Sequence, residues 1–386
     1  MSNTFPKAPV GASSIAGGTT TVLQITNDSV TSLSGAATKI PSSVTAVAVD
    51  VTVAAQTGSG YVTAYADGTQ HPLTSSTNYT AGNTATGYQI VPVGADGRID
   101  LYNQGSASDT VALIVDLTGY FTSDATLAGD QTYTPLATAT RALDTRAGVA
   151  NTNLSATGLV AANTAFTLQI GNTNGIPANA TAVAVNLTTA GQTGNGYLVA
   201  YPTGGTAPLL TSLTYRTTNA VGVASMAADV PLSSTGSMTI ANHGSTANVI
   251  VDIAGYYTNG TTGQKYHTVN PTRMVDTRNG TGALAIAPMP AMNNYVTAPA
   301  SIQQITTATR PTLVTVLTVT DNPQTGTVIA YPSDGTRPTT SNLNWVAATS
   351  TANLALTPAS ATDQITVYNH SSGTADLVID CSGYFN

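Results

Sequence analysis

The sequence predicts an all-β protein, built from three tandem antiparallel β-sandwich domains of jelly-roll or Greek-key-like type. The first observation is a repeat: a hydrophobic residue followed by Asp-x-x-Gly-Tyr-aromatic occurs at 115–121, 251–257 and 379–385. The second is composition, because the chain has no Glu and only three Lys, whereas Thr, Val, Tyr, Gly and Asn are frequent. Glu and Lys are typical of exposed helix faces, and the frequent residues are typical of strands and turns.

The repeat also sets the domain boundaries. Asp116, Asp252 and Asp380 of the three copies are 136 and 128 residues apart, which is an ordinary size for one domain. We expect a flexible Gly-, Ser- and Thr-rich arm over 1–20. The three modules that follow are expected over 21–125, 133–260 and 266–386.

Within each module, repeated runs predict strands in a fixed order. The first run is Ile-Pro-x-x-(Ala/Val)-Thr-Ala-Val-Ala-Val at 40–49 and 176–185, with a looser version at 310–317. A Gly-bearing turn and a strand follow at 56–65, 192–201 and 324–331. Later strands carry the pairs Asn78-Tyr79, Thr214-Tyr215 and Asn344-Trp345, and then 99–103, 238–242 and 365–369. Seven or eight short strands per module are typical of a sandwich, whereas a propeller blade has only about 40–50 residues.

Charge and composition exclude several classes of protein. The net charge is −7 and only 8 % of residues are charged, so there is no basic footprint for nucleic acid. No window approaches the roughly 18 apolar residues of a membrane span, and the N-terminus lacks the basic and apolar regions of a signal peptide. Cys381 is the single cysteine and replaces Leu117 and Ile253 of the other copies, so we expect a buried apolar side chain and no intrachain disulfide.

The copies differ at their starts. The second opens with Arg141-Ala-Leu-Asp-Thr-Arg146 and the third with Arg273-Met-Val-Asp-Thr-Arg278, but the first has no such segment. The first module therefore lacks a strand, or its place is filled by the N-terminal arm or by another chain. An unpaired sheet edge is a site for strand addition.

These motifs together resemble a tandem β-rich repeat module of actinobacterial extracellular proteins and of actinobacteriophage virion proteins. The resemblance covers about residues 35–386 and is carried by the Arg-x-(Leu/Val)-Asp-Thr-Arg opening, the Thr-Ala-Val-Ala-Val and Gly-Tyr-(Val/Leu)-x-Ala-Tyr runs, Ser341-Asn-Leu-Asn-Trp345 and the Asp-x-x-Gly-Tyr-aromatic ending. It implies a β-rich, non-catalytic module attached to surface or virion proteins.

Two sets of acidic and basic residues are candidates for chemistry. The pairs Asp144/Arg146 and Asp276/Arg278 lie on one face of a strand and suit either catalysis or a structural latch of ion pairs and hydrogen bonds to turn backbone. We interpret them as latches. Asp116, Asp252 and Asp380 are interpreted likewise, as acceptors of backbone N–H groups in the following Gly-Tyr turn, because no Asp-x-Asp-x-Asp run suggests a metal. No cofactor is expected.

Aromatic residues supply a possible ligand site. Tyr79, Tyr215 and Trp345 occupy one repeated position, where they could stack on sugars or pack in the core. The four histidines, His71, His243, His267 and His370, show no metal-binding spacing, and no Gly-x-Ser-x-Gly motif indicates a serine hydrolase.

The sequence therefore predicts a non-enzymatic structural protein of a phage virion: a capsid decoration, head fibre or tail-associated protein. Its N-terminal arm is expected to dock on other virion proteins, and a homo-oligomer, with a trimer favoured, is the expected state. The alternative is a multivalent glycan-binding adhesin on a cell or virion surface. A hydrolase is a third class. The expected location is the virion, or alternatively the extracellular space or cell surface.

Overall fold

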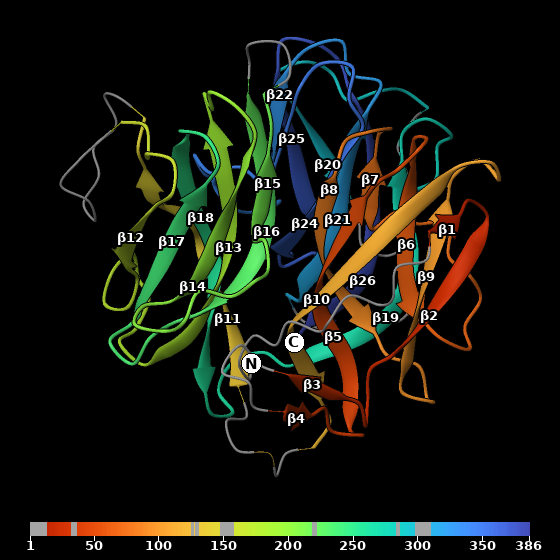
Figure 1. The fold of residues 1–386 in the computed structure, drawn as a ribbon. Helices are drawn as coiled ribbons and strands as arrows, with labels where there is room; N and C mark the ends of the chain where they lie inside the picture. The colour runs from red at the N-terminus through yellow and green to blue at the C-terminus, as the bar shows by residue number, and fades with distance from the viewer. Residues whose placement is uncertain are drawn as a thin grey trace.

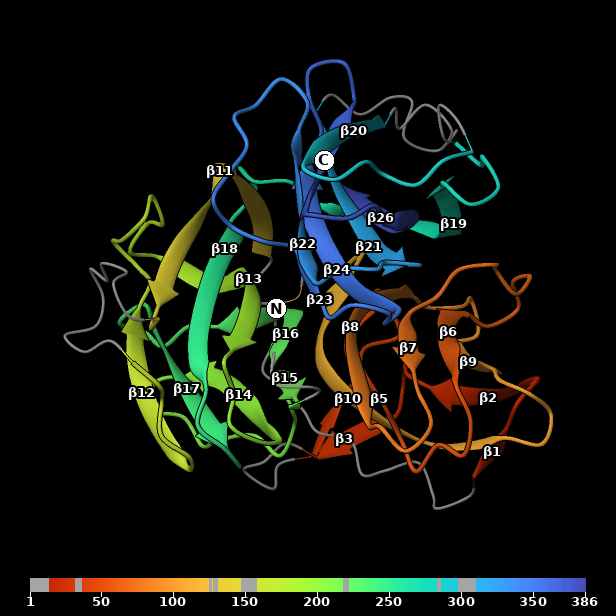
Figure 2. The same cartoon turned by 90° about the horizontal axis from the view of Figure 1, so that it is seen from above.

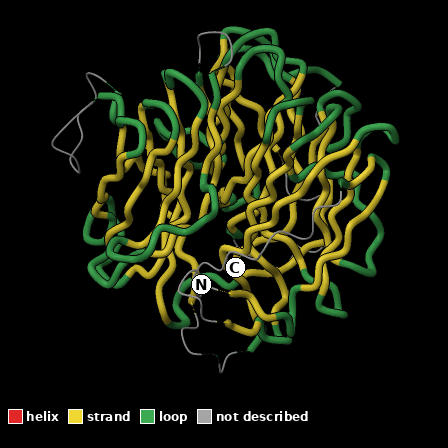
Figure 3. Tube along the Cα trace, in the orientation of Figure 1, coloured by secondary structure: helices red, strands yellow, loops and turns green. Residues whose placement is uncertain are grey.

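The computed structural model describes residues 14–31, 37–124, 127, 131–146, 158–217, 222–282, 286–297 and 310–386. All regular secondary structure in these ranges is β, as predicted, and Figure 3 shows strands joined by loops throughout. None of the described residues forms a helix of the length and apolarity needed to cross a membrane.

The second module is a complete eight-stranded sandwich. Its strands are β11 (Gln131–Asp144), β12 (Thr164–Gln169), β13 (Ala180–Ala190), β14 (Gly196–Pro202), β15 (Leu213–Tyr215), β16 (Val223–Pro231), β17 (Ser237–His243) and β18 (Asn248–Asn259). One sheet has the order β11-β18-β13-β16 and the other β12-β17-β14-β15. With strands numbered 1 to 8 along the module, these orders are 1-8-3-6 and 2-7-4-5, which is the jelly-roll arrangement of two Greek keys.

The third module repeats this topology, with sheets β19-β26-β21-β24 and β20-β25-β22-β23. Its strands are β19 (Tyr266–Asp276), β20 (Asn293–Thr297), β21 (Thr312–Thr320), β22 (Gly326–Pro332), β23 (Leu343–Trp345), β24 (Thr351–Pro358), β25 (Ile365–Ser371) and β26 (Asp376–Phe385).

The first module has the sheets β1-β10-β5-β8 and β2-β9-β6-β7, with a separate β3-β4 hairpin. Its strands are β1 (Ile15–Ala16), β2 (Thr19–Gln24), β3 (Ser29–Thr31), β4 (Ala37–Lys39), β5 (Val44–Ala54), β6 (Gly60–Ala66), β7 (Thr77–Tyr79), β8 (Ala85–Pro92), β9 (Arg98–Gln104) and β10 (Thr110–Thr122). The arm expected over 1–20 is thus too long, because β1 and the start of β2 already belong to the sandwich. Residues 1–13 lie outside the described residues.

The three sandwiches lie around a common centre, where β8, β16 and β24 face one another (Figures 1 and 2). Strand β5 shows how the sequence produces this packing. Because side chains alternate between the faces of a strand, Ala46 and Ala48 join a core cluster shared by all three modules, whereas Val47 and Val49 join the core of the first module. The small residues of the Ala-Val-Ala-Val run allow the neighbouring modules to approach, and the larger ones fill the sandwich.

Candidate functional site

In the second and third modules, the repeated Asp of the signature binds an arginine from the opening strand of its own module. In the second module, Arg141 donates from Nε to Oδ1 of Asp252 at 2.8 Å and from Nη2 to Oδ2 at 3.2 Å. In the third, Arg273 makes the same two bonds to Asp380 at 2.9 and 3.1 Å. Both are bidentate pairs, the strong form of a charge-assisted hydrogen bond.

The same carboxylates also bind a neighbouring module. Oδ2 of Asp252 accepts the backbone N–H of Ser341 in the third module at 3.0 Å, and Oδ2 of Asp380 accepts that of Ser75 in the first module at 3.2 Å. Burial raises the pKa of both carboxyl groups, and the arginines oppose that shift. Asp252 and Asp380 therefore each connect two modules.

This arrangement corrects the predicted partner of the signature Asp. The sequence predicts that Asp116, Asp252 and Asp380 accept N–H groups of a following Gly-Tyr turn. No turn is present, because the Gly-Tyr segment continues the strand, with a β-bulge between Leu117 and Gly119 in β10. Asp252 and Asp380 do accept hydrogen bonds. Their donors are an arginine in the opening strand of the same module and a backbone N–H group in a neighbouring module.

The aromatic residue that ends the signature also packs between modules. The ring centroids of Phe121 and Phe385 are 5.7 Å apart, and those of Tyr257 and Phe385 are 6.3 Å apart. Tyr133 and Tyr266, from the opening strands, complete this cluster at 4.7 and 5.3 Å from Phe385. The tyrosines also account for the signature glycines, because a Cβ at Gly255 would collide with Tyr133 and one at Gly383 with Tyr266.

The Asp-x-Arg pairs adopt a latch geometry. Oδ1 of Asp276 accepts both the backbone N–H of Arg278 at 3.1 Å and its Nε–H at 2.8 Å. Arg278 lowers the pKa of Asp276, against the opposite effect of burial. Asp144 and Arg146 repeat these contacts at 3.1 and 2.9 Å. Each latch Asp also accepts from the arginine that binds the signature Asp, because Arg141 reaches Asp144 at 3.1 Å and Arg273 reaches Asp276 at 3.2 Å.

The first module departs from this pattern at Asp116. No hydrogen bond or ion pair joins Asp116 to a described side chain, and burial raises its pKa to about 6. Directly across the sheet lies Asp50, which is fully buried and has one carboxyl oxygen without a described hydrogen-bond partner. The equivalent cross-strand neighbours are Asn186 for Asp252 and Val316 for Asp380. Two carboxyl groups therefore meet here, where the other modules have one carboxylate and a cation.

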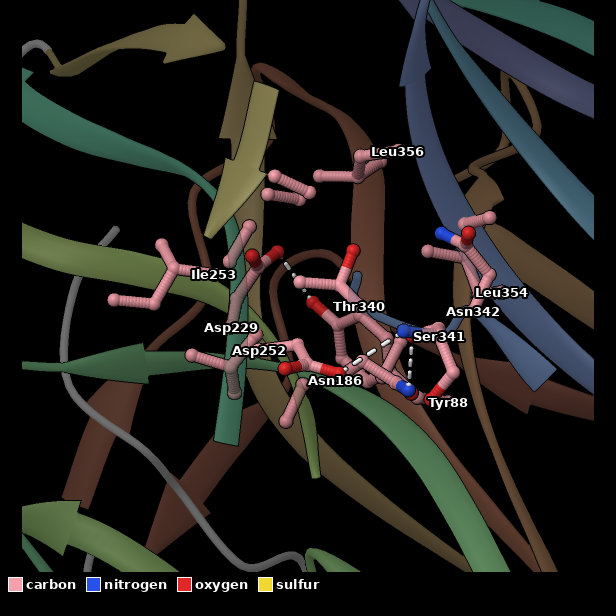
Figure 4. Close-up of a pocket in the computed structure, with 17 residues that line it drawn as sticks. Tyr88, Asn186, Asp229, Asp252, Ile253, Thr340, Ser341, Asn342, Leu354 and Leu356 are labelled. Atoms are coloured by element: carbon pink, nitrogen blue, oxygen red, sulfur yellow. Dashed lines mark hydrogen bonds between the residues drawn. The ribbon is translucent and has the colours of Figure 1, made fainter. Parts of the chain in front are cut away.

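Sequence reasoning missed Asp229, which is buried near the common centre. Its Oδ2 accepts the hydroxyl groups of Tyr88 from the first module at 2.6 Å and Tyr257 from the second at 3.1 Å. Burial raises its pKa to about 6. Figure 4 shows Asp229, Asp252, Asn186 and Ser341 around one cavity of about 30 Å³, which is large enough for a water molecule. An isolated Asp in an otherwise apolar strand was the signal in the sequence.

The predicted aromatic ligand site is not exposed. Tyr79, Tyr215 and Trp345 are only 5 %, 1 % and 1 % exposed. Each donates a hydrogen bond inside its own module, for example from the Tyr215 hydroxyl to Asn242 Oδ1 at 2.6 Å and from Trp345 Nε1 to the Gln324 carbonyl at 2.7 Å. Their ring faces cannot stack on a sugar, so of the two alternatives core packing fits these residues and sugar stacking does not. No group of three or more His, Cys, Asp or Glu in the described ranges could hold a metal ion.

Comparison with known proteins adds little. No protein-family model matches the chain, and no curated protein matches it in sequence. Among solved structures, the chain is similar at 9 % identity to one from "Life in the extremes: atomic structure of Sulfolobus Turreted Icosahedral Virus", covering 99 % of each chain. The TM-score is 0.15, which is too low to support a conclusion about fold or function.

Proposed function

We propose that this chain is a non-enzymatic structural protein of a phage virion, namely a capsid decoration, head fibre or tail-associated protein. The observation that carries the proposal is the use of the repeated signature: Asp252 and Asp380 bind both an opening strand and a neighbouring module. These hydrogen bonds join the second module to the third and the third to the first, and one apolar core cluster contains residues of all three. A single packed body of this kind suits attachment and display.

The resemblance to virion modules supports the same assignment, and jelly rolls are common in viral capsid proteins, although they also occur in lectins. Fold alone does not determine function, so that likeness is an analogy. In the proposed arrangement, the N-terminal arm docks on other virion proteins and the three modules project from the particle. A homo-oligomer, with a trimer favoured, completes the proposal.

Mass spectrometry of purified particles of the phage that encodes this chain tests the proposal directly. We expect peptides from all three modules at a fixed ratio to the major capsid or tail protein. Absence of the chain from intact particles would overturn the assignment. Light scattering of the purified chain separately measures whether it is a trimer.

The alternative of a multivalent glycan-binding adhesin loses its main support, because Tyr79, Tyr215 and Trp345 are buried. A glycan array is the deciding measurement. Specific binding to one glycan class, from particles or from the free chain, would favour the adhesin.

A further inference from the structure

One edge of the first module has no partner strand among the described residues over most of its length, and we call it the open edge. On one side, β10 pairs with β5 from Ala112 to Thr122. On the other side, β1 covers only Val111 and Thr110, and no other described strand pairs there. The equivalent edges of β18 and β26 are covered by β11 and β19. The position of β1 at the end of β10 can be followed in Figure 1.

Strand β1 does not replace the missing opening strand. Counting back five residues from the signature Asp makes Val111 equivalent to Ala247 and Ala375. Those two residues bridge to Val160 and Met289, which follow the opening strands in sequence. Ile15 of β1 is therefore the counterpart of Val160 and Met289, and the described part of the first module has no counterpart of β11 or β19.

The open edge has the side chains of an interior strand. Ile114 is 38 % exposed, whereas its counterparts Ile250 and Val378 are 4 % and 2 % exposed. Ile250 pairs with Asp144 of β11 and Val378 with Asp276 of β19, and a strand laid along the open edge would cover Ile114 from the same side. A long edge with apolar side chains is unfavourable in a free protein, and proteins commonly cover such edges.

Charge indicates what kind of strand belongs there. In the register of the other modules, Arg141 lies opposite Asp252 and Arg273 opposite Asp380. Asp116 occupies the same position without a described partner, next to Asp50, whose unsatisfied carboxyl oxygen is fully buried. Two carboxyl groups without a cation leave the site complementary to an arginine.

The residues that precede β1 fit this edge poorly. Residues 1–13 contain Lys7 but no Arg and no Asp-Thr-Arg latch. They also contain Pro6 and Pro9, three positions apart. Because backbone N–H groups alternate sides along a strand, one of these prolines would fall where the pairing needs a donor.

We propose that the open edge of β10 accepts an extended segment from another protein of the assembly, antiparallel to β10, with an arginine opposite Asp116. The partner segment is of the Arg-x-x-Asp-Thr-Arg type and adds a strand to the sheet. The inference rests on the proposed function only in that the donor of this segment is another component of the particle.

The first experiment uses a fluorescent peptide with the sequence of residues 131–146, which is the opening segment of the second module. We expect it to bind the full chain and to protect the amides of 112–122 from hydrogen exchange. Replacing the arginine of the peptide that corresponds to Arg141 by alanine, or Asp116→Asn in the chain, should weaken binding about 10- to 100-fold. Asp96→Asn, at an exposed pair, is the matched control and should have no effect.

A second experiment does not depend on the affinity of a free peptide. The same segment replaces residues 1–13 through a Gly/Ser linker long enough to reach along β10. We expect a higher thermal midpoint and protected amides at 112–122, and a smaller rise when the grafted arginine is alanine. A graft of scrambled sequence is the control, and an equal midpoint for the two grafts would overturn the proposal.

The chain's own arm and a second copy of the chain are tested as alternatives. Deletion of 1–13 should leave exchange at 112–122 unchanged; if it increases exchange, or is required for peptide binding, the arm itself covers the edge and the proposal fails. Protection of the same amides that rises with chain concentration would assign the edge to a second copy, which also overturns it. Absence of the chain from particles contradicts only the proposed function, because binding to the peptide is measured without particles.

Discussion

Asp380 in the third module accepts the backbone N–H of Ser75 in the first at 3.2 Å, across 305 residues of sequence. The same carboxylate is held by Arg273 from the opening strand of its own module. An opening strand therefore does more than complete a sheet, because its arginine fixes the carboxylate that contacts the next module. The first module has the carboxylate, Asp116, without that arginine.

We predict that Arg273→Ala lowers the free energy of unfolding by about 3 kcal/mol, because it leaves the buried Asp380 carboxylate without its cation. The matched control is Arg98→Ala, which breaks an exposed pair with Asp96 and should cost less than about 1 kcal/mol. Urea unfolding of both variants measures the difference. Equal midpoints would mean that the arginine does not stabilise the connection between modules.

Trp345→Ala should destabilise the chain by about 3–5 kcal/mol, because the indole ring is 1 % exposed and its removal leaves a cavity. Tyr197→Ala, at a ring that is 40 % exposed, is the control and should change stability little. Calorimetry measures both. A stable, folded Trp345→Ala variant that lost binding to a glycan would contradict the core assignment and restore the adhesin.

The fold class was predictable from the sequence, because the repeat, the absence of Glu and the alternating Ala-Val runs are local signals. The latch geometry of Asp276 and Arg278 was also accessible, since Asp-x-Arg places both side chains on one strand face. The partner of Asp380 was not, because Ser75 belongs to another module and no local pattern joins them.

Two further features depended on packing that sequence does not reveal. Trp345 has the same chemistry in a core as on a surface, and only the position of the neighbouring sheet decides between them. Asp229 lies in a strand whose second face would be exposed in an isolated sandwich. It becomes buried because three modules meet there, and no local pattern in the sequence indicates that contact.

The thiol of Cys381 should not react with a disulfide reagent in the native chain. The side chain is fully buried, and burial raises the pKa of the thiol to about 12, so almost no thiolate forms near pH 8. Ala107→Cys, at an exposed position, is a positive control and should react at once. Labelling with an absorbance readout, in buffer and in denaturant, is the measurement. Rapid labelling of Cys381 in buffer would mean that β26 opens readily.

Asp116→Asn should stabilise the chain at neutral pH, and the effect should disappear on acidification. Burial raises the pKa of Asp116 to about 6 from its ordinary value of 3.8, so between these values the native state binds more protons than the unfolded state. The free energy of unfolding therefore falls as the pH rises through this window. The stability that the protonated carboxyl group of Asp116 contributes at low pH is lost above about pH 6. Burial and Asp116 raise the pKa of Asp50 as well, so removing one charge also relieves the other. We expect Asp116→Asn to raise the free energy of unfolding by about 1–2 kcal/mol at pH 7.5, a value reduced for solvent screening of the carboxylate, and to leave it unchanged near pH 4. Urea unfolding across this range, with Asp96→Asn as control, is the measurement, and a gain that does not change with pH would show that charge is not its cause.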